Sequence, residues 1–228
     1  MVTARQAARE RMMRDIVRVG REHLATVRPA DLSLRAVARD IGVVPSALYR
    51  YVHDREALIT LLIVDAYSEL ADEVDAALAA ASSLSYRERL EVAVLAARAW
   101  AVREPSRFAM LYGTPVPGYA APGDQTVGPG TRFALALAGL VEDAWRAGEL
   151  RTVEAPLNPT VRADMERLRG VFGFEMPVGN VTRAYGLWSA VIGAILFDTF
   201  GQYAADTLSD PEEFLRAHTD GLADTVGL

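Results

Sequence analysis

One stretch of this sequence, Leu32 to Leu58, predicts a specific arrangement of short helices. Ser33 can cap a first helix with its hydroxyl, and apolar residues then recur at helical spacing. Gly42 follows where a helix ends on a residue that takes positive φ, and Pro45 supplies the fixed φ of a second helical turn. Two short helices joined by a turn of about four residues predict a helix-turn-helix, whose second helix reads the major groove of DNA.

The apolar pattern of this stretch leaves two interpretations open. A helical hairpin with no nucleic-acid partner would bury the same residues. In either case the second helix leaves polar, aromatic and basic side chains facing outward: Pro45, Ser46, Ala47, Tyr49, Arg50 and Tyr51.

The charge is divided unevenly along the chain. Residues 1–60 carry eleven Arg and seven Asp or Glu, a net charge of +4, whereas the other 168 residues carry thirteen Arg and twenty-three acids, a net charge of −10. A DNA-binding module needs only a local positive face, so the overall charge of −6 does not argue against DNA. The basic end is the end with the helix-turn-helix pattern.

Helices are predicted on both sides of this motif. A first helix spans 4–27 and is followed by Pro29; Arg5 and Arg9 near its start form either a solvated basic arm or one that touches DNA phosphate. Asp54 caps a helix that runs to about Ala81 and couples two domains, a DNA-binding domain at 1–60 and a larger helical domain at 61–228. The sequence therefore predicts an all-α protein.

The helix-turn-helix stretch resembles the N-terminal domain of the tetracycline-repressor (TetR) family. The family pattern Leu-Tyr-x-His/Tyr-Phe/Val, followed by Lys/Arg-Glu-x-Leu, is LYRYV at 48–52 and DREAL at 54–58, with Tyr51 where His is commoner. Farther along, LWSAVIGAILFDTFGQY at 187–203 is similar to the Trp-x-x-x-His-Gly region of one TetR branch, with Ile192 where His is typical. The YGTPVPGY segment at 112–119 looks like the same branch.

The resemblance implies a dimeric regulator, a repressor, that is released from a near-palindromic DNA operator by a small apolar effector. Ser33 and Arg35 would hold phosphate, Pro45, Ser46 and Ala47 would approach base edges, and Tyr49, Arg50, Tyr51 and Arg55 would anchor the DNA backbone. The alternative role for Arg50 is to read guanine instead. The alternative is a constitutive or architectural DNA-binding protein whose second domain only dimerises.

The larger domain is predicted to bind the effector and a second copy of the chain. Aromatic and sulfur-bearing residues at helical spacing are either pocket or ordinary core: Trp100, Phe108, Met110, Tyr112, Trp145, Met165, Phe172 and Trp188. The helices at about 180–205 and 210–226 are expected to dimerise, since the first is apolar nearly all round. Residues 113–130 hold four Pro and five Gly and predict a surface loop or a lid.

Other functional classes find little support. The chain has no Cys, its three His are scattered, and it lacks glycine-rich nucleotide-binding and nucleophile-elbow motifs. No catalytic residue, metal or cofactor is therefore predicted. We expect a cytoplasmic protein, because no apolar run reaches the roughly 18 residues of a membrane span and no signal peptide is recognisable.

Overall fold

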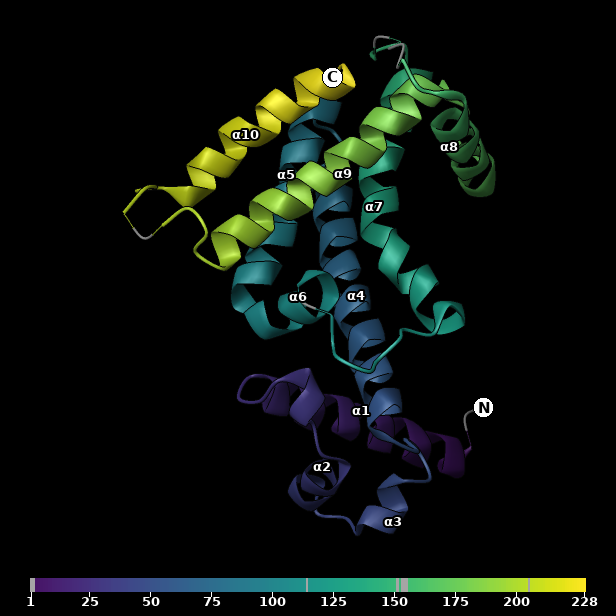
Figure 1. Ribbon diagram of the computed structural model, residues 1–228, viewed down its shortest axis with the longest axis vertical. Helices are drawn as coiled ribbons and strands as arrows, with labels where there is room; N and C mark the ends of the chain where they lie inside the picture. The colour runs from purple at the N-terminus through teal and green to yellow at the C-terminus, as the bar shows by residue number, and fades with distance from the viewer. Residues whose placement is uncertain (1–2, 114, 151, 153–155, 205) are drawn as a thin grey trace. The chain divides into compact units, whose positions relative to one another are not determined.

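The computed structural model describes residues 3–113, 115–150, 152, 156–204 and 206–228, and within these the chain is all-α. Figure 1 shows the element order. The first helices are α1 (Ala4–Leu24), a 3-10 turn (Pro29–Asp31), α2 (Leu34–Ile41), α3 (Pro45–Leu48), α4 (Arg55–Ala80), α5 (Tyr86–Arg103) and α6 (Pro105–Tyr112). They are followed by α7 (Gly123–Arg146), α8 (Pro159–Phe172), α9 (Val178–Thr199) and α10 (Pro211–Val226).

The chain divides into two compact units, and α4 runs through both. One unit holds residues up to Glu69 together with Glu104–Gly130; the other, here called the body, holds Leu70–Arg103 and Thr131–Leu228. The sequence predicts a boundary at residue 60 between a DNA-binding domain and a larger effector-binding domain. That division is by function, and it stays a prediction.

The first unit contains the head, residues 3–63, built from α1, α2, α3 and the start of α4. Its core includes Ile16, Val37, Leu48 and Leu58, all fully buried. The signals read from the sequence act as predicted: the Ser33 hydroxyl accepts a hydrogen bond from the amide of Ala36, and Gly42 ends α2 at a φ of +83°. Here α1 packs on α2, and α2 on α3, as a helix-turn-helix requires.

In the body, α5, α9 and α10 pack against one another, and α8 packs on α9. A capping box begins α5, with the Ser85 amide 2.9 Å from Oε2 of Glu88. Asn158 caps α8 by accepting a hydrogen bond from the amide of Val161. Asp210 caps α10 by accepting from the amide of Glu213.

The prediction that 113–130 contains no helix is wrong for its second half. Helix α7 begins at Gly123 and includes Pro129. Pro129 has no N–H to donate to the carbonyl one turn earlier, but the apolar residues farther along α7 hold the helix by burial. At Gly130 the backbone passes close to Tyr67, so that a Cβ there would lie 3.2 Å from the ring.

Two smaller corrections concern helix ends and burial. Helix α1 ends at Leu24 rather than at residue 27, and Val27 is 39% exposed. Helix α8 contains no fully buried residue, and the predicted pocket or core residues Met165 and Phe172 on it are half-buried. In the described part of the chain, no helix combines the length and apolar character that crossing a bilayer would need.

Candidate nucleic-acid interface

The predicted reading element, α3 and the residues that follow it up to Tyr51, is anchored in the head core by one side chain. Leu48 of α3 is fully buried in the head core, whereas Pro45, Ser46, Tyr49 and Arg50 are exposed. Ala47 and Tyr51 are half-buried. After Leu48 the chain continues in tight turns, since the amides of Tyr51 and Val52 both bond its carbonyl. Anchoring one side of so short an element leaves the other side free for a partner.

Four predicted DNA-binding residues line one shallow depression of about 490 Å³ on the head. They are Ser33, Arg35, Tyr49 and Arg55, and they share it with Leu34, His53 and Asp54. Arg55 is partly committed to the scaffold, because its Nη1 donates to the carbonyl of Ala30 at 2.7 Å. Hydroxyl and guanidinium donors gathered in one depression are the groups that hold a phosphate.

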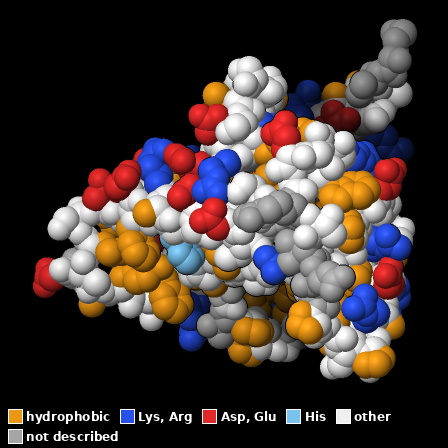
Figure 2. All heavy atoms as spheres, turned by 90° about the horizontal axis from the view of Figure 1, so that it is seen from above, with side chains coloured by type: hydrophobic (Ala, Val, Ile, Leu, Met, Phe, Trp, Pro, Cys, Tyr) orange, Lys and Arg blue, Asp and Glu red, His pale blue; other side chains and the backbone are white. Residues whose placement is uncertain are grey.

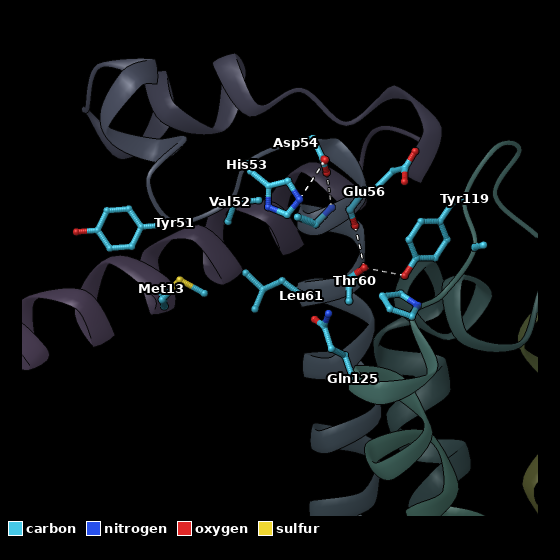
Figure 3. Close-up of a pocket in the computed structure, with 13 residues that line it drawn as sticks. Met13, Tyr51, Val52, His53, Asp54, Glu56, Thr60, Leu61, Tyr119 and Gln125 are labelled. Carbon is cyan, nitrogen blue, oxygen red and sulfur yellow. Dashed lines mark hydrogen bonds and ion pairs between the residues drawn. The ribbon is translucent and has the colours of Figure 1, made fainter.

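A second cleft, of about 360 Å³, lies beside the start of α4 (Figure 3). It is lined by Met13, Thr60 and Leu61, together with Tyr119 from the segment that follows α6 and Gln125 from the start of α7. The hydroxyls of Thr60 and Tyr119 are 2.9 Å apart and form a hydrogen bond. Val116 and Tyr119 also pack against the head core. The described residues of 115–122 therefore lie on the head, a contact that sequence reasoning missed.

A buried ion-pair network joins three helices of the first unit. Arg107 of α6 is 3% exposed and reaches Asp65 at 2.9 Å and Glu69 at 3.0 Å on α4. Arg21 of α1 binds the same Asp65 at 2.7 Å, and that hydrogen bond raises the pKa of Arg21 further above its ordinary value. Two acids one turn apart, the only ones in the apolar stretch 57–71, were the sequence signal that could have revealed this network.

The predicted effector residues are divided between the two units. Phe108, Met110 and Tyr112 lie on α6 of the first unit; the body holds Trp100, Trp145, Met165, Phe172 and Trp188. Trp100 and Phe108 are fully buried. The ring of Tyr112 packs on Phe108 at a centroid distance of 5.2 Å and edge-on to Tyr67 at 5.9 Å. In the body, the ring of Trp188 packs on that of Tyr185 at a centroid distance of 5.5 Å.

Two of these side chains carry buried polar atoms that have no hydrogen-bond partner among the described residues, the hydroxyl of Tyr112 and the indole Nε1 of Trp188. Burial, with a smaller contribution from Tyr67, raises the pKa of Tyr112 well above its ordinary value, so the hydroxyl keeps its proton. A buried donor left unpaired costs free energy. Both groups could therefore donate to a molecule that enters beside them.

The body carries an aromatic group near the junction of α9 and α10. Ring contacts connect Phe197 to Tyr203, Tyr203 to Phe214, and Phe214 to His218. Phe197 is 50% exposed and Phe214 40% exposed. Figure 2 shows apolar side chains gathered beside a histidine on this face. Exposed large aromatic side chains that cluster in this way are typical of protein interfaces.

Comparison with known proteins places this arrangement in a family. Residues 90–222 match the family model described as the tetracyclin repressor-like C-terminal domain. The chain is 43% identical over 218 residues to the HTH-type transcriptional regulators Rv1816 of Mycobacterium tuberculosis and Mb1846 of Mycobacterium bovis, an alignment that covers 96% of this chain and 93% of each relative.

Solved structures agree with the sequence relatives. The crystal structure of SCO4313, described as a regulatory protein, matches with a TM-score of 0.75 and 31% identity, covering 99% of this chain and all of the other. RolR, solved with resorcinol, shares the fold at a TM-score of 0.57 and 12% identity, covering 96% of this chain and 93% of RolR. These relatives are regulators rather than enzymes, and the chain belongs to the TetR family of transcriptional regulators.

Proposed function

We propose that this protein is a ligand-responsive repressor that binds a near-palindromic operator as a homodimer and is released by a small, largely apolar effector. The observation that carries the DNA-binding part is the head: a fully buried Leu48 beneath exposed Tyr49 and Arg50, with Arg35 and Arg50 forming no ion pair with any described residue. Unpaired guanidinium groups are available to phosphate, which dominates the affinity of such proteins for DNA.

Each predicted DNA-binding residue has a role that its position supports. Ser33 and Arg35 would bind phosphate from the depression described above, and Arg55 would do so from its rim. Pro45, Ser46 and Ala47 would face base edges, with the methyl group of Ala47 available to thymine. Tyr49, Arg50 and Tyr51 would contact the backbone. A dimer must present two such elements about 34 to 36 Å apart, or a multiple of that, so the operator should have matching half-sites.

The dimer contact is proposed for α9 and α10. Tyr185, Phe197 and Phe200 on α9 or at its end are between 38% and 50% exposed, although large aromatic residues are usually buried. The same surface on a second copy would cover them around a twofold axis. Sedimentation analysis of the purified protein at micromolar concentration should give a dimer, and a monomer would contradict this proposal.

The buried hydroxyl of Tyr112, which has no hydrogen-bond partner among the described residues, supports an effector that offers a hydrogen-bond acceptor on a largely apolar body. The fold is compatible with such a ligand, since RolR binds resorcinol. Because Tyr112 lies on the same helix as Arg107, an effector that shifts α6 would act on the ion-pair network that ends at Arg21 of α1. A coupling of about 1 to 3 kcal/mol is typical of such linkage.

The competing function is constitutive DNA binding, with a body that only dimerises. Thermal unfolding in the presence of a panel of small phenols and aromatic acids separates the two. A sensor gains stability with at least one compound, and the same concentration releases a DNA fragment taken from upstream of its own gene. If no compound changes either the melting temperature or DNA binding, the constitutive function is the correct one.

A further inference from the structure

The face of α1 that packs into the head core continues toward the N-terminus as arginine. Ile16 is fully buried, and Met12 and Met13, one turn earlier, pack against the same core. Arg9 lies three and four residues before these methionines, and Arg5 lies one further turn back. Residues at this spacing share one side of a helix. The inward side of α1 therefore changes from apolar to cationic where the core ends.

At that edge Arg9 meets the predicted reading element. Its guanidinium lies over the ring of Tyr51, 5.7 Å from the ring centroid, in the geometry of a cation–π contact. Figure 3 shows the hydroxyl of Tyr51 directed away from the cleft beside α4. Arg9 thus contacts the face of the ring from α1, while its own N–H groups and the tyrosine hydroxyl stay available to another molecule.

The arginines of α1 differ in their partners along the helix. Arg18 pairs with Glu22, and Arg21 pairs with Asp65. Arg5 and Arg9 form no ion pair with any residue that the structure describes. Since α1 begins at Ala4, these two residues belong to an ordered helix rather than to the basic arm that the sequence suggested. Their positions relative to Tyr51 are therefore fixed by the fold.

We propose that Arg5 and Arg9 extend the DNA interface from α3 onto the first turns of α1. Arg9 positions the Tyr51 ring and donates to a phosphate beside it, and Arg5 donates to a neighbouring phosphate of the same strand. This proposal rests on the DNA-binding role of the head. It adds basic residues of α1 to the DNA-binding surface. Tyr51 would then contact DNA while its ring is held by Arg9 of α1.

The test is fluorescence anisotropy with a labelled operator fragment, measured between 50 and 300 mM salt. Arg9→Ala should weaken binding about tenfold and lower the slope of log K against log salt by about 0.9, the value expected for one lost phosphate contact. Arg5→Ala should lower the slope by a similar amount. Arg9→Lys should keep the slope, because the charge remains.

The chain offers a matched control on the same helix. Arg11 is also exposed and forms no ion pair with a described residue, but two residues of helix turn it about 200° away from Arg9. Arg11→Ala should leave both affinity and salt slope unchanged. An equal effect of Arg9→Ala and Arg11→Ala would overturn the proposal, since it would reflect net charge alone.

The positioning role of Arg9 needs a separate readout, the double-mutant cycle with Tyr51→Ala. Arg9→Ala and Tyr51→Ala together should cost clearly less than the product of the two separate effects; a full product would mean that Arg9 does not act through the ring. Arg50→Ala distinguishes a failure of the proposed role of Arg9 from a failure of the proposed DNA-binding role of the head. If Arg50→Ala loses operator binding and Arg9→Ala binds like the wild type, the role of Arg9 is wrong but the DNA-binding role of the head stands. If Arg50→Ala also binds like the wild type, the proposed reading element is wrong as well.

Discussion

The arginines of the head and those of the body differ in what they contact. In the head, Arg5, Arg35 and Arg50 form no ion pair with the described residues, and Arg9 contacts only a ring. In the body, Arg98 binds Asp198 and Arg132 binds Asp72 and Asp75. Several arginines of the head are therefore free, although Arg18, Arg21, Arg28 and Arg39 of the head are paired with acids. A body with a net negative charge contributes little attraction for DNA, so the positive field is concentrated in the head.

Like Arg98 and Arg132 of the body, Arg107 is held in ion pairs, and it is the most deeply buried of the three. Replacing Arg107 with Met should lower the free energy of unfolding by about 3 kcal/mol, because a nearly buried guanidinium is lost together with its ion pairs to Asp65 and Glu69. Thermal unfolding followed by circular dichroism measures this loss. A change below about 1 kcal/mol would show that the network is not structurally important.

Arg50→Ala tests whether the arginines of the head that form no ion pair bind DNA. Operator affinity should fall by about 2 kcal/mol, roughly 30-fold, with little change in stability, because the side chain is exposed and forms no ion pair with a described residue. Arg162→Ala is the matched control, since Arg162 is an exposed arginine of the body with no ion pair in the described part of the chain. Equal losses in the two variants would remove the distinction between head and body.

Tyr119→Phe probes the contact between the segment after α6 and the head. It removes the hydrogen bond to Thr60 and keeps the ring in place, and the hydroxyl of Thr60 still donates to the carbonyl of Glu56. Unfolding stability should fall by about 1 kcal/mol. If this contact also carries the effector signal, the variant should need a different effector concentration to release DNA, which anisotropy would detect.

The smallest effect is expected for Arg87→Ala in the body. Arg87 binds Asp220 and Asp224, whose side chains are 63% and 68% exposed. The hydrogen bonds that Arg87 donates to Asp224 and Asp220 raise its pKa, but exposed pairs are screened by solvent, so the loss of stability should stay near 0.5 kcal/mol and shrink further at high salt. A salt-independent loss above about 2 kcal/mol would show that surface pairs of the body matter as much as Arg107.

Local signals in the sequence were sufficient for the head. Ser33, Gly42 and Pro45 act through their own backbone and capping chemistry, so the two short helices and their turn could be placed from a few neighbouring residues. The family assignment followed from the same residues. The roles of individual residues at the DNA and effector sites stay predictions, because the structure contains neither partner.

The sequence by itself determined the all-α class, the helix-turn-helix and the concentration of positive charge at one end, since each depends on residues a few positions apart. Only the tertiary structure decided that α7 continues through Pro129, that Tyr119 reaches Thr60, and that Arg21 and Arg107 share Asp65. These contacts join residues far apart in the chain, and the energy of burial that fixes them depends on which helices pack together. No spacing pattern within a single helix contains that information.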